Sequence, residues 1–584
     1  MSRFARLGAL SAAAALALAP AVGRAQAAAD AVPAPAPTLP LKHAPQPTTA
    51  DITAADLMTR LYIFADDSMM GREAGTAGNV KGTDYIAGEV KRLGLKPAGE
   101  NGTYFQTLPF KTRSVDSSSA IVIPGATPVR LLPGRDWAAA SIRGVSLHDV
   151  AVVYGGTLGD SASLVSPDQT AGKLVVFTVA NVRAPQLRRG FGDTYAKAAG
   201  IVVAGPLLDP IVPRFARPQT FVDDPAKTAP GQPDQPILIA TTAAAGQLFA
   251  TPIQGLAPGA PGRAVTLDLK LNVVPVPFPA RNVVAVLPGR DPAVAGEYVA
   301  IGAHNDHIGI ARTAVDHDSI RIYNHIVRPE GAEDAAKQAT GPQQAEVDDE
   351  LAAYRKAHPN SARRDSISNG ADDDGSGSVS VLEIAQKFAS LTGDARPRRS
   401  ILFVWHVGEE KGLLGSEYFT DHPTVPRDSI VAQLNMDMVG RGRASDVTGM
   451  SKEGQVLHGG PDYLQLVGSR RLSTELGNIV EQVNKDDKHG FVFDYAMDAN
   501  GHPMNIYCRS DHYEYARYGI PIVFFTTGGH SDYHQVTDEP EYIDYDHMAR
   551  VDNLVYDIAL RVADLDHRVV VDHPKPDPKG TCRQ

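Results

Sequence analysis

The chain has 584 residues, which is too long for one ordinary domain and predicts two or more folded domains. Hydrophobic residues make up 43% and charged residues 21%, a composition that excludes a disordered protein. Its formal net charge of −11 argues against nucleic acid as a natural partner, because binding to phosphates depends on clustered basic residues.

Residues 1–27 have the pattern of a cleavable signal peptide. A basic start with Arg3 and Arg6 precedes an apolar run that continues to Val22, and small residues then form a cleavage site. The run is short for a membrane span and contains a proline. We therefore expect a secreted or periplasmic protein with no stable membrane anchor after cleavage.

The chain contains two cysteines, Cys508 and Cys582. An oxidising compartment permits a disulfide between them, but their separation along the chain leaves pairing and free thiols as equal alternatives. Neither cysteine lies in a CxxC motif or a Cys/His cluster, which argues against a cysteine-based zinc site or nucleophile.

The amino-acid composition and the spacing of apolar residues change twice along the first half of the chain. Residues 28–50 are rich in Ala and Pro and are expected to form a linker. Residues 51–113 begin with apolar residues at helical spacing and form the first part of a domain that resumes at residue 274. Residues 114–273 are expected to form a separate β-rich unit, since short apolar runs alternate with Gly and Pro. These runs are Val150–Tyr154, Lys173–Thr178, Gly200–Ala204 and Ile237–Ala240.

Residues 274–565 are predicted to be α/β, with a mostly parallel or mixed sheet flanked by helices. The runs of strand length are Asn282–Leu287, Tyr298–Ala303, Ile401–Trp405, Val431–Asn435 and Pro521–Phe525. Helical stretches such as Ser378–Leu391 separate them. A polar stretch over 326–364 is predicted to be a partly helical surface insertion, and 566–584 to be a polar tail.

Histidines and carboxylates follow the ends of these strands, where ligands bind in open α/β sheets. They are His304, Asp306, Glu409, Glu410, Asp437 and His534, joined by an Asp-rich turn at 372–374. Two histidines with three carboxylates suit zinc, and a turn aspartate can bridge two ions. Hydrolysis by paired metals also needs a carboxylate base, so adjacent Glu409 and Glu410 suit one base and one ligand. Asp306, two residues after His304, can orient that imidazole.

At these positions the sequence resembles the M28 family of metallopeptidases. The matching motifs are Gly302–Gly309, Asn369–Gly377, Gly408–Ser416, Asn435–Gly440 and Ser510–His534. Asp66–Glu73 and Ala171–Phe177 also resemble members that carry a protease-associated (PA) domain. The resemblance covers about residues 51–565 and implies a zinc exopeptidase fold, in which 274–565 is the catalytic domain and 114–273 is a PA-like insert.

The resemblance also implies a site with two zinc ions. His304 and Asp437 are expected to bind one ion and Glu410 and His534 the other, with Asp373 as the bridge. Asp372 or Asp374 is the alternative bridge if the motif is shifted by one residue. Glu409 is then the general base and Asp306 the group that orients the histidine. Relatives often have a cis peptide after the bridging aspartate.

Substrate contacts are expected from Tyr533, Arg509 and Asp511, near the end of the motif set. The predicted activity is that of an aminopeptidase acting on peptides. The alternatives are a carboxypeptidase for acidic dipeptides, a glutaminyl cyclase with one zinc, and a non-catalytic binding protein. A complete set of ligands and the Glu409 base favour two metals and catalysis, whereas the 326–364 insertion leaves substrate preference open.

Overall fold

The computed structural model describes residues 39–141, 144–158, 164–179, 194–224, 235–334, 337–359, 363–578, 580 and 582–584. The expected signal peptide, 1–27, and the first part of the linker lie outside the described residues. Within these ranges, no helix combines the length and the apolar character needed to cross a bilayer.

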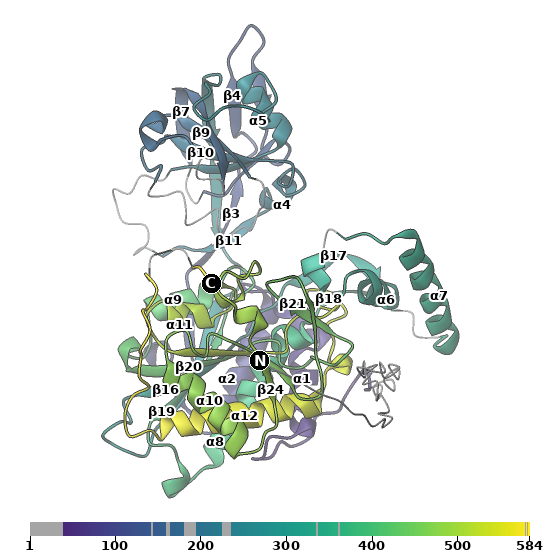
Figure 1. The fold of residues 1–584 in the computed structure, drawn as a ribbon, viewed down its shortest axis with the longest axis vertical. Helices are drawn as coiled ribbons and strands as arrows, with labels where there is room; N and C mark the ends of the chain where they lie inside the picture. Colours follow the sequence, from purple (N-terminus) through teal and green to yellow (C-terminus); the bar gives the residue numbers. More distant parts are fainter. Residues whose placement is uncertain are drawn as a thin grey trace, which may run out of the picture. The chain divides into compact units, whose positions relative to one another are not determined.

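A nine-stranded mixed sheet lies at the centre of the α/β part of the chain (Figure 1). Its order is β1-β15-β19-β16-β20-β25-β23-β24, with β2 paired to β15. The strands are β1 (Lys96–Pro97), β2 (Phe105–Leu108), β15 (Ala280–Leu287), β16 (Tyr298–His304), β19 (Ser400–His406), β20 (Ile430–Met436), β23 (Tyr463–Val467), β24 (Val492–Asp494) and β25 (Ile522–Thr526). The five strands predicted for this part of the chain are confirmed.

The four inner strands β19, β16, β20 and β25 are parallel to one another. Strand β15 is antiparallel to β19, and β23 is antiparallel to β25, so the sheet is mixed, as predicted. Every residue of β19 and β20 is buried, which explains why these strands have continuous apolar runs in the sequence.

Helices cover both faces of the sheet. One group consists of α1 (Ala54–Phe64), α2 (Ala77–Arg92), α8 (Gly377–Ser390) and α12 (Tyr545–Ala563), and the other consists of α9 (Leu414–Asp421) and α11 (His512–Ala516). Neighbouring residues at the end of β19 show this division. The Trp405 indole N–H donates to the Ser378 carbonyl on α8, whereas the His406 ring lies 3.0 Å from the Tyr515 hydroxyl on α11.

The β-rich part of the chain contains three further sheets. Their orders are β6-β12-β10-β9-β8, β5-β4-β13-β7 and β11-β3-β14. The strands are β3 (Phe110–Val115), β4 (Ala120–Ile123), β5 (Val129–Leu131), β6 (Trp137–Ala139), β7 (Val145–Val150), β8 (Val152–Leu158), β9 (Leu174–Val179), β10 (Gly200–Ala204), β11 (Gln219–Val222), β12 (Ile237–Ala240), β13 (Val265–Leu269) and β14 (Leu271–Pro275). Residues of the first two sheets share one hydrophobic core around Trp137 and Leu238.

A two-stranded ribbon encloses the stretch predicted as an insertion. Strands β17 (Gly309–Asp316) and β18 (Arg364–Ser368) pair in antiparallel fashion, with Gly309 opposite Ser368. Between them lie α6 (His317–Val327), the short 3-10 helix η5 (Gly331–Asp334) and α7 (Gly341–Ala357). Only Val347 of α7 is buried, so this helix has almost no core of its own.

A disulfide joins Cys508 to Cys582, which decides between the two alternatives left by the sequence. The two residues are 74 positions apart and their Cα atoms are separated by 5.8 Å. The bond attaches the C-terminal segment close to Ile506, whose side chain lines the pocket described below. The enclosed loop contains β25 and α12, so the bond restricts a large part of the α/β domain in the unfolded chain.

We expect that replacing both cysteines by serine lowers the free energy of unfolding by at most about 4 kcal/mol, the loop-closure value for a cross-link of this span. Differential scanning calorimetry of the purified protein measures the change as a lower transition temperature. A reducing agent should lower the transition of the wild type and leave the double variant unchanged. Titration of two free thiols in the native protein would contradict the pairing.

Candidate functional site

Three of the parallel strands deliver side chains to the same edge of the sheet. Strand β16 ends at His304, Asp437 follows β20 directly, and Glu409 and Glu410 follow β19. The parallel register places His304 beside His406, and Gly302 beside Asn435. These residues are distant in sequence but meet because parallel strands all end on one side.

The Asp-rich turn Ala371–Ser376 brings a shared carboxylate to this edge. Asp373 Oδ1 lies 3.2 Å from His304 Nε2, and Asp373 Oδ2 lies 2.9 Å from His534 Nε2. The Asp373–Asp374 peptide bond is cis, as the family resemblance implies. The structure thus places Asp373 between the two histidines.

Asp372 and Asp374, on either side of Asp373, accept hydrogen bonds from backbone N–H groups. Asp374 accepts hydrogen bonds from the backbone N–H groups of His304, at 3.0 Å, and Gly377, at 2.9 Å. Asp372 Oδ1 accepts one from the Gly440 N–H at 2.7 Å. A Cβ atom at position 377 would lie 2.3 Å from Asp374 Oδ1, which explains the glycine there. Both carboxylates are therefore occupied in holding backbone, and neither faces the histidines as Asp373 does.

Asp538 holds the same turn from the opposite side. Its carboxylate accepts hydrogen bonds from the backbone N–H groups of Asp372 and Asp373, both at 3.0 Å. Its backbone carbonyl accepts another from the Ala371 N–H at 3.0 Å. These contacts fix the direction of the Asp373 side chain through its main chain.

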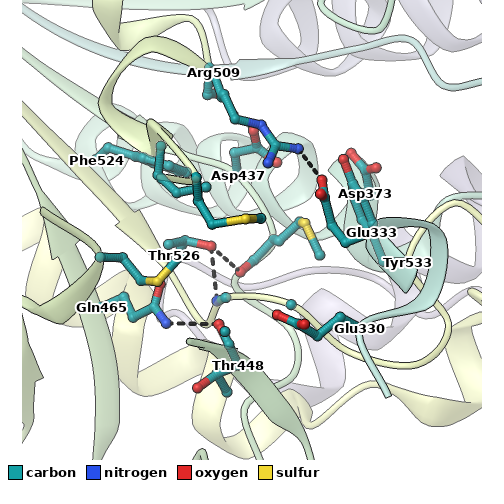
Figure 2. Close-up of a pocket in the computed structure, with 18 of the residues that line it drawn as sticks. Glu330, Glu333, Asp373, Asp437, Thr448, Gln465, Arg509, Phe524, Thr526 and Tyr533 are labelled. Atoms are coloured by element: carbon teal, nitrogen blue, oxygen red, sulfur yellow. Dashed lines mark hydrogen bonds and ion pairs between the residues drawn. The ribbon is translucent and has the colours of Figure 1, made fainter. Parts of the chain in front are cut away.

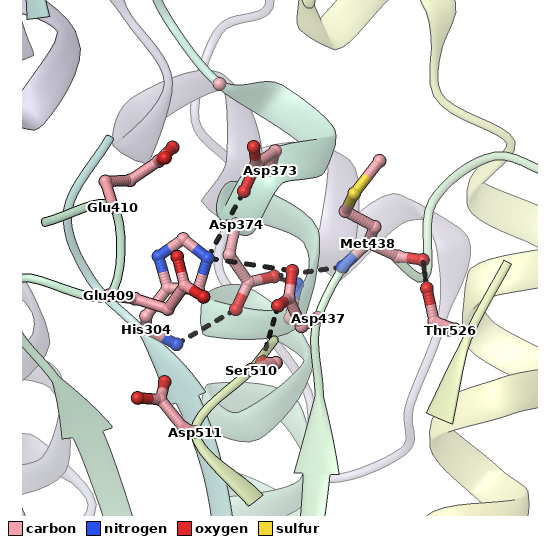
Figure 3. A network of polar contacts seen from close by, with 12 residues as sticks. His304, Asp373, Asp374, Glu409, Glu410, Asp437, Met438, Ser510, Asp511 and Thr526 are labelled. Carbon is pink, nitrogen blue, oxygen red and sulfur yellow. Dashed lines mark hydrogen bonds and ion pairs between the residues drawn. The ribbon is translucent and has the colours of Figure 1, made fainter. Parts of the chain in front are cut away.

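Two groups of potential metal ligands share Asp373. Figure 3 shows His304, Asp373 and Asp437 of one group and Glu410 of the other. One group contains His304, Asp373 and Asp437, and the other contains His307, Asp373, Glu410 and His534. Within each group the ligand atoms lie no more than 4.8 Å apart. His304 Nε2, Asp437 Oδ1 and Glu410 Oε1 are buried, and within the described residues their close ion-pair partners are other members of the two groups. Such converging buried donor atoms fit divalent cations with nitrogen and oxygen ligands.

The pKa shifts of both groups indicate a site that favours positive charge. Burial lowers the pKa of His304, but the carboxylates of Asp437 and Asp373 prevail and raise it well above the usual value. The pKa of His534 is also raised, because Glu410 and Asp373 outweigh its burial. Conversely, burial raises the pKa of Glu410, yet His534 and other neighbours bring it down to about 2. The site therefore attracts positive charge strongly, which is what bound cations supply.

His304 is oriented by a backbone carbonyl. Its Nδ1 lies 3.0 Å from the Asp306 carbonyl oxygen and 3.9 Å from the Asp306 carboxylate. A proton on Nδ1 then leaves Nε2 free to face Asp373. The Asp306 carboxylate instead accepts hydrogen bonds from the backbone N–H groups of Gly408, at 2.6 Å, and Glu409, at 3.2 Å. Asp306 thus also positions the segment that carries Glu409 and Glu410.

Glu409 lies beside both ligand groups and lines the adjoining pocket (Figure 3). Burial, followed by repulsion from carboxylates including Asp437 and Glu410, raises its pKa well above the usual range, against the opposing effect of His304. A carboxylate with a raised pKa beside a metal centre has the character of a proton acceptor.

A pocket opens next to these groups and is lined by apolar side chains (Figure 2). The apolar lining comes from Met438, Met497, Met504, Ile506 and Phe524. Tyr533 and Arg509 also line it, as expected for substrate contacts. Tyr533 stacks on His534 with ring centroids 4.1 Å apart, and Arg509 forms an ion pair with Glu333 of η5. Asp511 does not reach the pocket, because its carboxylate is fully buried 3.5 Å from His406 Nδ1.

Sequence reasoning assigned no role to three residues that the structure brings to this region. His307 Nδ1 lies 2.7 Å from Glu410 Oε1, and the Ser510 hydroxyl donates to Asp437 Oδ2 at 2.7 Å. Glu330 lines the pocket from the insertion. His307 and Ser510 lie within the family motifs, so the sequence contained a reason to consider them. Glu330 lies in a polar stretch that matches no motif.

Part of the chain is similar to known peptidases. Residues 342–559 match the model described as Peptidase family M28. Leucine aminopeptidase 1 of Paracoccidioides brasiliensis (strain Pb03) is 31% identical over 204 residues, 33% of this chain and 47% of that protein. Leucine aminopeptidase 1 of Coccidioides posadasii (strain C735) is 30% identical over 203 residues, with the same coverage. The matched segment thus spans about half the length of these curated relatives.

A solved structure of an aminopeptidase from Aneurinibacillus sp. strain AM-1 is similar over 90% of this chain and 97% of its own. The two sequences are 15% identical, and the TM-score is 0.48.

We expect Asp538→Asn to weaken zinc binding about 10- to 100-fold, the usual cost of removing a group that supports a metal ligand. An asparagine retains one acceptor oxygen, so one of the two backbone N–H groups of the turn loses its partner. Competition with a fluorescent chelator measures the affinity, and Asp546→Asn, on the exposed side of α12, is the matched control. Equal zinc affinity in the Asp538 variant and the wild type would show that the turn does not depend on this carboxylate.

Proposed function

Since the chain belongs to peptidase family M28, we propose that it is an aminopeptidase that uses two zinc ions to hydrolyse the first peptide bond of peptides. The observation that carries the proposal is the shared carboxylate of Asp373, whose two oxygens face two different groups of ligands. In this proposal His304 and Asp437 hold one ion, Glu410 and His534 hold the other, and Asp373 bridges them.

The metal ions, when bound, supply Lewis-acid polarisation of the scissile carbonyl and of a water molecule. Glu409 is then the general base. It takes a proton from the water and passes it to the departing amine, so that the same carboxylate serves both halves of the reaction. Its place beside His304 and its raised pKa support this assignment.

Tyr533 is proposed to donate a hydrogen bond to the oxygen that becomes negative during hydrolysis. Burial raises the pKa of its phenol, which keeps the hydroxyl protonated as a donor. Stacking on His534 fixes the ring beside one metal ligand. Asp306 supports the reaction indirectly, since it orients the backbone before Glu409.

The charge of the pocket supports recognition of an amino terminus. Apart from the proposed metal ligands, its lining includes the carboxylates of Glu330, Glu333 and Glu409, whereas Arg509 is its one basic residue within the described part of the chain. Arg509 is already paired with Glu333. A substrate carboxylate would therefore meet unfavourable charge, which counts against the carboxypeptidase alternative. The presence of both ligand groups counts against a one-zinc cyclase.

We further propose that the protein is exported after removal of residues 1–27. The Cys508–Cys582 bond supports this proposal, because disulfides form and persist in oxidising compartments.

A peptide with free ends is expected to lose single residues from its amino end, and a chelator should abolish this activity. Blocking the amino end should prevent hydrolysis, while blocking the carboxyl end should not, because the acidic pocket receives the ammonium group. Mass spectrometry of the products distinguishes these results. Loss of residues from the carboxyl end would instead move the protein to the carboxypeptidase class.

Glu409→Gln is expected to lower kcat by about 10²- to 10⁴-fold, the range for loss of a general base. The amide keeps the shape of the side chain, so two zinc ions per chain should still be found by plasma mass spectrometry. Glu410→Gln should lose metal as well as activity, and Glu453→Gln, on an exposed turn, should change neither. Undiminished turnover in the Glu409 variant would refute the assigned base.

A further inference from the structure

Glu330 is a buried carboxylate that faces the pocket without a partner. Only 7% of the residue is exposed. Its carboxylate oxygens have no hydrogen-bond or ion-pair partner within the described ranges, although the side chain lines the pocket. Figure 2 shows Glu330 among the residues that line the pocket, near Thr448. An isolated buried charge is costly, so such a group indicates that something else supplies the opposite charge.

The position of Glu330 is built into the fold. Its backbone N–H donates to Asp334 Oδ2 at 3.0 Å, and Asp334 forms an ion pair with Lys337 at 2.7 Å. The next turn is attached to the metal site, because the Ala332 N–H donates to the Tyr533 carbonyl at 3.1 Å. The carboxylate is thereby held at a fixed place relative to the segment that carries His534.

Close contact reinforces this attachment. Gly331 has a φ of +57°, and a Cβ atom there would lie 2.7 Å from the Tyr533 carbonyl oxygen. Only glycine combines that backbone conformation with so close an approach. The insertion is therefore part of the pocket wall.

The neighbouring charges leave Glu330 uncompensated. Glu333 is neutralised by Arg509, whereas burial and the carboxylate of Asp334 raise the pKa of Glu330, with Lys337 opposing them. Glu330 lines the same pocket as Asp437 and as the apolar side chains of Met438 and Phe524. A complementary ligand therefore has an aliphatic stem and a positive end.

We propose that Glu330 binds the cationic side chain of an amino-terminal lysine or arginine, whose methylene groups pack against Met438 and Phe524. This inference rests on the proposed function and names the substrate class of the same site. The substrate's α-ammonium is only two bonds from the scissile carbonyl, so it stays beside Glu409 and Asp437. Glu330 and Thr448 lie across the pocket from Asp437 and Arg509 in Figure 2, at the place for the far end of a long side chain.

The test compares two substrates that differ almost only in charge, lysine p-nitroanilide and norleucine p-nitroanilide. The wild type should cleave the lysine substrate with a kcat/KM at least ten times higher. Glu330→Gln should lower that ratio about 10- to 100-fold through a lower kcat/KM for the lysine substrate, the effect of removing a charge-assisted hydrogen bond. Glu330→Asp should retain part of the preference. Glu346→Gln, on the exposed surface of α7, is the matched control.

Calorimetric binding of free lysine and free norleucine to the zinc-loaded Glu409→Gln protein gives a readout without turnover. Lysine should bind more tightly, and adding Glu330→Gln should remove the difference. If norleucine is cleaved but the wild type shows no preference for lysine in rate or binding, this inference is overturned while the aminopeptidase proposal stands. If neither substrate loses its amino-terminal residue, the proposed function itself fails.

Discussion

Crowding of negative charge at the carboxyl edge of the central sheet is the constraint on which the rest of the site depends. Three consecutive aspartates of one turn lie close to Glu410 and Asp437. Like charges repel strongly where water is excluded, so the fold has to supply opposing dipoles or cations. Backbone N–H groups bind both oxygens of Asp374 and Oδ1 of Asp372, whose Oδ2 lies 3.2 Å from His530 Nε2, and this leaves both oxygens of the middle carboxylate to face His304 and His534. The orientation of Asp373, with one oxygen toward His304 and the other toward His534, follows from that division of donors.

The rigid strands of the sheet hold these like-charged side chains in fixed positions. The inner strands are buried on both faces, and the groups that follow them inherit fixed positions. Two further contacts hold His304. Its backbone N–H donates to the Asp374 carboxylate, and its ring Nδ1 lies 3.0 Å from the Asp306 carbonyl oxygen. The same carboxyl groups thus serve structure and chemistry, since Asp374 ties strand to turn and Asp306 ties His304 to the Glu409 segment.

Much of this arrangement could be predicted from the sequence. Continuous apolar runs ending in His304, Asp437 and Glu409 indicated buried strands with polar ends, and the parallel sheet brings such ends together. The sequence could not choose among Asp372, Asp373 and Asp374 on chemical grounds. Three identical side chains differ only in the direction that the backbone gives them, and that direction depends on distant donors.

Other features escaped prediction for physical reasons. The alternation of side chains along an extended strand predicted that the Asp306 carboxylate would contact His304. Strand β16 ends at His304, however, and the backbone carbonyl of Asp306 contacts the ring instead. Asp511 follows a pocket residue directly, yet its side chain turns inward to His406. Glu330 lies in a charged stretch of the kind that normally faces solvent. Its burial depends on Ala332 contacting Tyr533, a residue two hundred positions away (533 − 332 = 201).

The β17–β18 ribbon has a consequence for how this protein can diversify. Because Gly309 and Ser368 are paired, the chain leaves and re-enters the catalytic domain at nearly the same point. Insertions and deletions between them cost little loop-closure entropy and need not displace the strand before them or the turn after them. One wall of the pocket can therefore be exchanged in evolution, or by grafting, while the cluster of histidines and carboxylates at the edge of the sheet is inherited unchanged.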